Sequence, residues 1–483
     1  MSNKPELILP APKNVQVYEG ELTITAGISF DVPSWDNYAE TFRSALEKIF
    51  ECKIEYGNGV LLKSDTTLLP SSYVIDTLGD QMIISAADDE GICYGIATAI
   101  QLITVQDNRI CVARTHIEDA PDKSFRGLMI DLARKWHPAS KIYQYIDICF
   151  MLKLKYLHLH FIDDQNYTLP SRAFPKLMKA NRHYTEEDIS RFCSYANARG
   201  VILIPELEVP GHAAYVIEQY PEIFGNVLDN GDTCAMTTEE GAVITAKNII
   251  CAGSSTTFNA VKALVNEVCT LFPDAPFIHI GGDEANINAW NYCKHCRSYM
   301  EKQGISNVRE LYSEFTGRVA QLVLDNGKTP IVWEGFPKDG VRYIPKDTIV
   351  IAWESLYHLP NELLEAGFKI INASWKPLYH VSNLNIRWEP KEILNWDVYT
   401  WRNWWNKSAA YLNPIRVSPS DNVLGAEFCF WSCTYEQEIS YVMVKGAALA
   451  ERVWSLERKD DDTACYFRIT TITKLISRLI QEL

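Results

Sequence analysis

The sequence lacks any hydrophobic run of the roughly 18 residues that a membrane-spanning helix needs. Apolar stretches such as residues 200–220 are interrupted by Glu206, Glu208 and Pro210. Residues 1–10 also lack the basic segment and apolar segment that together mark a secretory signal. We therefore expect no membrane partner.

Basic residues are in the minority, because 46 Lys and Arg stand against 61 Asp and Glu, and the formal net charge is -15. Such a chain repels a phosphate backbone, which argues against nucleic acid as a partner. The sequence has no internal repeat, low-complexity tract or glycine-rich phosphate-binding motif. A nucleotide enzyme therefore has little support, and we expect no cofactor.

The cysteines do not form an obvious disulfide framework. Their count of thirteen is odd, and Cys149, Cys193, Cys269 and Cys429 lie inside apolar runs like small core residues. Reduced cysteines and the missing signal favour the cytoplasm, although a chain trimmed of a secretory signal would look the same.

One cysteine pair has metal-ligand spacing. Cys293 and Cys296, with His295 between them, form a CxxC, but no second ligand pair follows at a suitable distance. We expect a structural or incidental role for this pair, and no metal.

Hydrophobic residues at 47% and charged residues at 22% are typical of a globular protein. A length of 483 residues suggests two to four domains, or fewer where one is a large barrel. Residues 1–121 predict a small α+β domain that ends near Asp119, Ala120 and Pro121. Its expected strands are 22–28, 73–75 and 81–85, and its expected helices are 38–50 and 89–102.

Residues 122–483 alternate continuous apolar segments with amphipathic helical ones. The eight expected strands are 126–131, 156–162, 201–207, 277–280, 330–333, 349–353, 369–373 and 423–430. Eight such strands alternating with helices predict an α/β fold, a (β/α)8 TIM barrel. One clear helix has Thr185 as its cap, begins at Glu186 and stops before Gly200.

The expected strand ends carry acidic, basic and aromatic side chains. These are Asp131, Arg134, His160, Asp163, Asp164, Glu206, Glu208, His212, Asp283, Glu284, Trp333, Trp353 and Trp431. Barrel enzymes place their active sites at this face, and carboxylates among aromatic rings suit a sugar.

Four segments match one known family in the same order: FRGLMIDLARKWHP from residue 125, LHLHFIDDQNY from 157, IPELEVPGHA from 204 and FIHIGGDE at 277–284. The chain resembles the β-N-acetylhexosaminidases of glycoside hydrolase family 20, over nearly its whole length. The resemblance implies a retaining exo-enzyme that hydrolyses terminal β-linked N-acetylglucosamine or N-acetylgalactosamine from a glycan or glycoconjugate. The natural glycan, the linkage and the oligomeric state stay open.

In that family the substrate's 2-acetamido oxygen is the nucleophile, which gives an oxazolinium intermediate. By resemblance Glu284 is the general acid, with a pKa raised toward neutrality. Asp283 would stay ionised and hold the acetamido N–H. Gly281 and Gly282 would break the strand so that both side chains serve one site.

The remaining assignments also follow from the resemblance. His212 and Asp163 match the pair that supports the acid, Arg134 matches the residue that grips the 3- and 4-hydroxyls, and Tyr379 matches the tyrosine that bonds the acetamido oxygen. The ring-lined pocket would be formed by Trp333, Trp353 and Trp431.

One position departs from the family pattern. Cys433 stands where many members carry a Glu that binds an outer hydroxyl, so Glu436 is a candidate replacement and the sugar preference is open. The tryptophan-rich segment 396–405, which begins with Trp396 and ends with Trp405, would either stack further sugars or cover the barrel.

Plainer alternatives exist for these residues. Asp283 and Glu284 could cap a helix, His212 could be a core histidine, and Arg134 could pair only with Asp131. Two other functions are a glycan-binding protein without catalysis and a barrel enzyme that acts on a related sugar.

Overall fold

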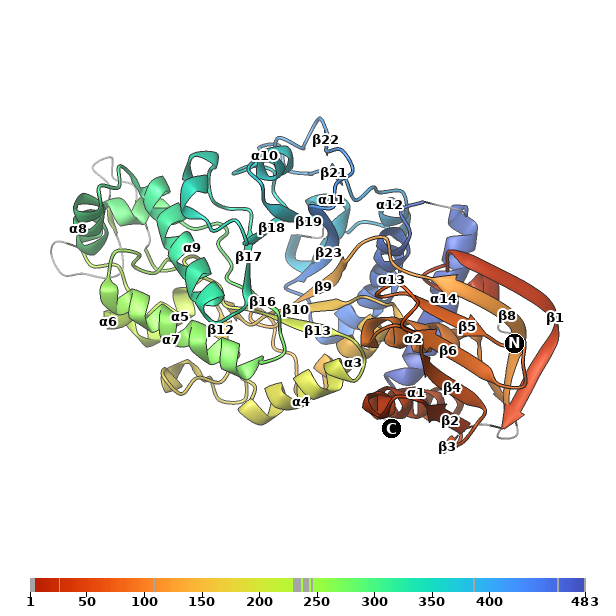
Figure 1. The fold of residues 1–483 in the computed structure, drawn as a ribbon. Helices are drawn as coiled ribbons and strands as arrows, with labels where there is room; N and C mark the ends of the chain where they lie inside the picture. The colour runs from red at the N-terminus through yellow and green to blue at the C-terminus, as the bar shows by residue number, and fades with distance from the viewer. Residues whose placement is uncertain are drawn as a thin grey trace.

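The computed structural model describes residues 5–25, 27–106, 109–228, 236–237, 243–244, 246–384, 387–457 and 460–481. An N-terminal α+β part packs beside a closed barrel (Figure 1). The sheet of the first part has the order β1-β8-β5-β6-β4-β2-β3, and β7 pairs with β8. Its strands are β1 (Asn14–Thr25), β2 (Gly27–Phe30), β3 (Glu55–Tyr56), β4 (Val60–Ser64), β5 (Tyr73–Asp76), β6 (Met82–Ala86), β7 (Thr104–Gln106) and β8 (Arg109–Asp119).

Two helices cover this sheet, α1 (Asp36–Phe50) and α2 (Asp89–Leu102), close to the bounds that periodicity predicts. The Asp88 side chain accepts a hydrogen bond from Gly91 N and so caps α2. α2 packs on β5 and β6 and on the first barrel helix, so it is buried along most of its length.

Eight parallel strands form the barrel, and the pairing of β19 with β23 closes it. This confirms the predicted (β/α)8 barrel behind a small α+β part. The strands are β9 (Phe125–Asp131), β10 (Tyr156–His160), β13 (Ile202–Glu206), β16 (Phe277–His279), β17 (Thr329–Trp333), β18 (Ile349–Ala352), β19 (Lys369–Asn372) and β23 (Val423–Trp431). Every residue of β9 and β10 is buried, as expected for strands that are covered on both faces.

The larger helices around the barrel are α3 (Ala139–Met151), α4 (Glu186–Asn197), α7 (Ser255–Leu271), α8 (Lys294–Gln303), α9 (Val308–Asp325), α10 (Pro360–Glu365) and α13 (Tyr435–Trp454). Thr185 and Asp188 form a capping box at the start of α4, and Gly200, at φ +66°, follows its end, as the sequence predicts. Short helices are α5 (Ala214–Gln219), α6 (Pro221–Phe224), α11 (Trp375–Leu378) and α12 (Pro390–Leu394).

Short strands lie in the loops between the barrel elements: β11 (Ile162–Asp163), β12 (Asn166–Tyr167), β14 (Met236–Thr237), β15 (Val243–Ile244), β20 (Tyr379–Val381), β21 (Thr400–Trp401) and β22 (Ile415–Arg416). β20 pairs in parallel with the end of β23, so it extends the barrel wall at its carboxyl end.

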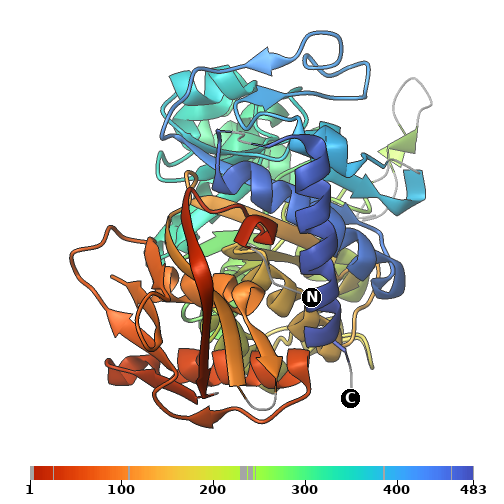
Figure 2. The same ribbon diagram turned by 90° about the vertical axis from the view of Figure 1, so that its right-hand side faces the viewer.

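The last helix, α14 (Asp462–Leu479), packs on α13 and α3 of the barrel and on α1 of the N-terminal part (Figure 2). At the junction Asp119, at the end of β8, accepts hydrogen bonds from Tyr73 Oη at 2.7 Å and Trp454 Nε1 at 3.0 Å. The buried Lys153 ammonium lies 3.5 Å from the same carboxylate. The division at residues 121 and 122 falls between β8 and β9, and as a domain boundary it stays a prediction.

Within the described part of the chain, no helix combines the length and the apolar character that crossing a membrane requires.

Candidate functional site

A sharp turn follows β16 and carries the two adjacent carboxylates. Gly281 has φ +68° and Gly282 has φ +98°, and Glu284 itself adopts φ +44°. Neighbouring side chains on a regular strand point to opposite faces, so this turn is what lets both acids face one side. Asp283 and Glu284 line a cavity of about 300 Å³.

A buried carboxyl supports the turn from below. Glu208 Oε1 accepts a hydrogen bond from Gly282 N at 3.0 Å, and the Tyr312 hydroxyl donates to Gly282 O. The fit is tight, because a Cβ built on Gly281 would lie 1.9 Å from Glu208 Oε2. Burial, with the Asp283 charge nearby, raises the pKa of Glu208 well above its ordinary value, which favours its protonated form.

His212 lies between the carboxylate pair and a second acidic group. Its Nε2 is 3.5 Å from Glu284 Oε2 and 3.7 Å from Asp283 Oδ2, and its Nδ1 is 3.4 Å from Asp163 Oδ1. Burial lowers the pKa of His212, but the nearby carboxylates of Asp163, Glu284 and Asp283 outweigh it and raise the pKa well above its ordinary value. These carboxylates therefore favour the cationic imidazole.

Asp163 connects His212 to Arg134. An Arg134 guanidinium nitrogen lies 2.7 Å from Asp163 Oδ2, and His160 Nε2 lies 2.8 Å from the same oxygen. Burial raises the pKa of Asp163, yet its histidine and arginine partners lower it far more, so it stays ionised. Arg134 also forms an ion pair with Asp131, with a guanidinium nitrogen 3.3 Å from Asp131 Oδ2. The plainer interpretation of Arg134, a pair with Asp131, is therefore present, but Arg134 lines the cavity as well.

Glu206 is a further buried carboxylate, and it contacts Trp333 and two histidines. It accepts a hydrogen bond from Trp333 Nε1 at 2.6 Å. It also lies 2.9 Å from His279 Nδ1 and hydrogen-bonds with His160. Trp333 is only 1% exposed and does not belong to the cavity wall. Its ring lies 6.0 Å from that of Trp431, so it forms the layer beneath the wall.

Aromatic rings form much of the wall. Trp375 and Tyr379 stack with ring centroids 4.4 Å apart, and the Arg134 guanidinium lies 4.8 Å from the Trp431 ring centroid. The lining residues are Arg134, Asp283, Glu284, Trp353, Trp375, Tyr379, Val381, Leu384, Trp431 and Ser432. Rings opposite charged groups are the arrangement that a pyranose needs, because its faces are apolar and its edge is polar.

The structure thus brings the expected residues together, with Trp333 one layer deeper than expected. Sequence reasoning missed Trp375, although it follows β19 closely as a strand-end aromatic. It also gave no supporting role to Glu208, and Val381 and Leu384 carried no signal because apolar residues are common everywhere.

The pKa directions reverse our expectation for the two acids. The neighbouring His212 imidazole, 3.5 Å from Glu284 Oε2, lowers the pKa of Glu284, whose side chain is 55% exposed. Burial raises the pKa of Asp283 to about 6, with the Glu284 charge adding to the effect. The reason is local: Asp283 is deeper in the cavity, whereas Glu284 sits at its mouth beside a cation.

Cys433 is buried and does not line the cavity. The Ser382 hydroxyl donates to its sulfur at 3.4 Å, and the thiol lies 3.3 Å from Trp431 O. Glu436, the candidate replacement, is exposed on the first turn of α13 and does not line the cavity. Val381 and Leu384 instead make the adjoining wall apolar.

The tryptophan-rich segment 396–405 covers the barrel with two of its rings and reaches the cavity wall with another. Trp396 and Trp401 are buried, with the Trp401 indole donating to Ala352 O at 2.9 Å, so they cover the barrel. Trp404 is 40% exposed, and its ring lies 5.7 Å from that of Trp375 at the cavity wall.

The support of the turn after β16 can be tested by two glycine substitutions. Gly281→Ala adds left-handed backbone strain of about 1 kcal/mol and a clash with Glu208 that costs about 2 kcal/mol more. Gly304→Ala is the matched control, because Gly304 has φ +69° but open space around its α-carbon. In urea unfolding, the free energy of unfolding should fall by about 3 kcal/mol for Gly281→Ala and by about 1 kcal/mol for Gly304→Ala. Equal losses would mean that Glu208 does not brace the turn.

Comparison with known proteins assigns both parts of the chain to one family. The model of glycosyl hydrolase family 20, catalytic domain, matches residues 124–457, and that of glycosyl hydrolase family 20, domain 2, matches residues 5–120. A β-hexosaminidase subunit beta of Entamoeba histolytica is 29% identical over 80% of this chain and 70% of its own length. A β-hexosaminidase of Vibrio furnissii is 25% identical over 75% of this chain and 62% of its own length.

Solved structures share the fold. A family 20 exo-β-N-acetylglucosaminidase from Vibrio harveyi, solved with N-acetylglucosamine, matches with a TM-score of 0.83 and 20% identity, over 98% of this chain and 78% of that one. A Flavobacterium johnsoniae chitobiase matches with a TM-score of 0.79 and 24% identity, over 99% of this chain and 73% of that one. The resemblance found in the motifs is confirmed, and the chain belongs to glycosyl hydrolase family 20 and is a glycoside hydrolase.

Proposed function

We propose that this enzyme is a retaining exo-β-N-acetylhexosaminidase that releases terminal β-linked N-acetylglucosamine or N-acetylgalactosamine by substrate-assisted catalysis. One observation carries the proposal. Among the described residues that line the cavity, the only carboxylates are Asp283 and Glu284, which come from a single turn. Glycosidases that use a protein nucleophile place two carboxyl groups on either side of the bond, so here the nucleophile must come from the substrate.

Asp283 is the group that would hold the substrate's amide. Its Oδ1 is buried and has no hydrogen-bond partner among the described residues. An acetamido N–H that donates to this oxygen would remove the unsatisfied acceptor and aim the amide oxygen at the anomeric carbon. As positive charge spreads onto the amide, ionised Asp283 stabilises it.

Glu284 would move the proton. In the first step the amide oxygen bonds to the anomeric carbon, the bond to the leaving oxygen breaks, and Glu284 donates its proton to that oxygen. In the second step water attacks the anomeric carbon, the bond to the amide oxygen breaks, and Glu284 takes a proton from the water. Two inversions at one carbon leave its configuration unchanged.

Substrate binding would shift the pKa values of Asp283 and Glu284 so that Asp283 is ionised and Glu284 is protonated. The amide N–H lowers the pKa of Asp283 by bonding its charged form, while a sugar that covers Glu284 removes water from it and raises its pKa. The rings of Trp353, Trp375 and Tyr379 would surround the acetyl methyl group and keep water out.

The role of Glu284 can be tested by Glu284→Gln, which keeps the shape but has no proton to give. We expect kcat/KM to fall by roughly 10²–10⁴-fold on a β-linked N-acetylglucosamine disaccharide. The loss should be smaller on the 4-nitrophenyl glycoside, since nitrophenolate leaves without protonation. Glu365→Gln is the control, because Glu365 is exposed at the end of α10. Unchanged turnover in the Glu284 variant would overturn the assignment of Glu284 as the general acid. A wild-type chain that binds the glycan without hydrolysing it would indicate a glycan-binding protein instead of an enzyme.

The role of the amide can be tested with 4-nitrophenyl β-glycosides that differ only at C2. The 2-acetamido sugar should be hydrolysed, whereas the 2-hydroxy sugar, which lacks the nucleophile, should react at least 10³-fold more slowly. A thiazoline that mimics the oxazolinium ion should inhibit competitively. Comparable rates at C2 and no inhibition would mean that another group attacks the sugar.

The proton shared by the two acids should set the basic limb of the pH profile. The first step needs one proton on the pair, and Asp283, whose pKa is raised to about 6 in the free enzyme, is the acid that holds it longest, because the pKa of Glu284 is lowered. The kcat/KM value for the 2-acetamido glycoside should therefore decrease as the pH rises through about 6. Asp283→Asn should be much less active, and its basic limb should move to lower pH, where Glu284 alone loses its proton. A limb that persists unchanged in the variant would assign it to another group.

A further inference from the structure

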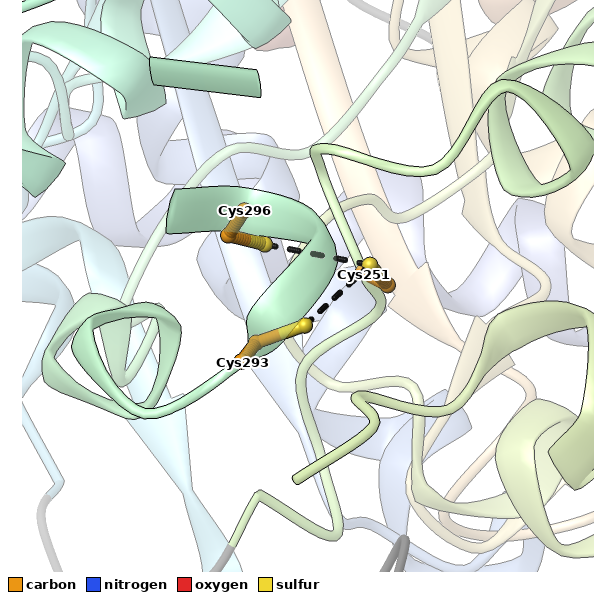
Figure 3. Close-up of side chains that lie close together, drawn as sticks. All are labelled: Cys251, Cys293 and Cys296. Atoms are coloured by element: carbon orange, nitrogen blue, oxygen red, sulfur yellow. Dashed lines mark hydrogen bonds between the residues drawn. The ribbon is translucent and has the colours of Figure 1, made fainter. Parts of the chain in front are cut away.

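Three cysteines from two distant segments meet beside the catalytic domain's α8 (Figure 3). Cys251 lies just before α7, and Cys293 and Cys296 lie at the start of α8. Cys251 Sγ is 3.5 Å from Cys293 Sγ and 3.8 Å from Cys296 Sγ, and all three sulfur atoms lie within 4.8 Å of one another. All three side chains are fully buried.

The spacing matches a metal better than any covalent link. Zn²⁺ binds cysteine sulfur at about 2.3 Å in tetrahedral sites, which places two bound sulfur atoms roughly 3.8 Å apart. A disulfide needs about 2.05 Å. Three sulfur atoms that converge at this separation leave room between them for one ion, whereas three thiols that only fill space have no reason to point at one another.

The side chain of Asn226 offers a fourth ligand atom. Asn226 is fully buried, and its Oδ1 lies 3.9 Å from Cys296 Sγ. The Asn226 amide nitrogen donates to Ile249 O at 2.7 Å, which fixes the orientation of the side chain and turns its oxygen toward the sulfur atoms. The Asn226 carbonyl oxygen is therefore placed beside Cys296 Sγ as a fourth ligand candidate.

The two segments that carry the cysteines approach closely at Gly253. A Cβ on Gly253 would lie 2.5 Å from Cys296 Cα, so only glycine allows the two segments to approach this closely.

We propose that Cys251, Cys293 and Cys296 bind one zinc ion as thiolates, with Asn226 Oδ1 facing the fourth position. The three thiols release three protons to solvent on binding, and no electron is transferred. The three sulfur atoms are fully buried and Asn226 lies beside them, which is typical of a structural site and not of a catalytic one. The zinc departs from our sequence-based expectation of no metal, because the fold supplies Cys251 from outside the CxxC.

The ion would anchor the chain that leaves the catalytic turn. Between Glu284 and Cys293 lies a short helical segment, Ile287–Asn291, whose buried Trp290 donates to Ile250 O at 2.9 Å. Lys294 N also donates to Val227 O at 2.9 Å. The zinc would join these same segments by strong bonds, so that the exit of the turn is tied to the start of α7.

The test is the metal content of the untagged wild-type chain and three variants, measured by inductively coupled plasma mass spectrometry. We expect one zinc per wild-type chain, less than a tenth of that in Cys251→Ser and Cys296→Ser, and one zinc in Cys269→Ser. Cys269 is the matched control, because it is a buried cysteine on α7 that lies outside the cluster. Equal zinc in the wild type and the Cys296 variant would overturn the proposal.

A second measurement uses the wild-type chain alone, in case the variants fail to fold. Exchange of the metal for Co²⁺ should give a thiolate-to-cobalt charge-transfer band and the intense visible bands of a tetrahedral centre. Reduced, metal-free chain that binds neither Zn²⁺ nor Co²⁺ in equilibrium dialysis would overturn the proposal. An intact mass two hydrogens below the reduced value, with the missing pair mapped to these cysteines, would overturn it as well.

Discussion

The site depends on one constraint of backbone geometry: two neighbouring residues can face the same side only where the strand ends. β16 stops at His279, and Gly281 and Gly282 then turn the chain through conformations that other residues rarely adopt. The buried Glu208 carboxyl fills the space where a side chain on Gly281 would be. Burial and the Asp283 charge raise the pKa of Glu208, which favours its protonated form, and a second negative charge close to Asp283 would oppose the ionisation of Asp283.

Electrostatics then gives the two adjacent acids different properties. Asp163 is kept ionised by Arg134 and His160, and it in turn keeps His212 protonated, so that a cation stands beside Glu284. Asp283 lies deeper and is governed by burial. In the empty cavity the deeper acid therefore binds its proton more tightly than the outer one. Under the proposed function the substrate reverses this order, so that the proton-transfer machinery is complete only when a sugar with an amide is bound.

Sequence patterns predicted the barrel well, because strands buried on both faces are continuous apolar runs whose number and spacing survive errors at their ends. β8 was missed, although its residues alternate in burial as expected for a strand with one covered face. For the site, a position at a strand end indicates which face a residue serves but not its depth, which is why Trp333 was expected in the wall and lies beneath it. The sulfur cluster could not be predicted, because nothing in the sequence links Cys251 to a CxxC that is distant along the chain.

The cavity lining is not uniform. Charged groups, Arg134 among them, and aromatic rings form part of it, whereas Val381 and Leu384 are apolar and the buried Cys433 does not line the cavity. Interactions that accelerate a reaction are those that become stronger in the transition state. In the proposed mechanism, charge develops at the anomeric carbon and on the amide, and little changes at the far hydroxyls. A wall that binds those hydroxyls weakly would therefore cost affinity for the sugar far more than it costs the rate of bond cleavage.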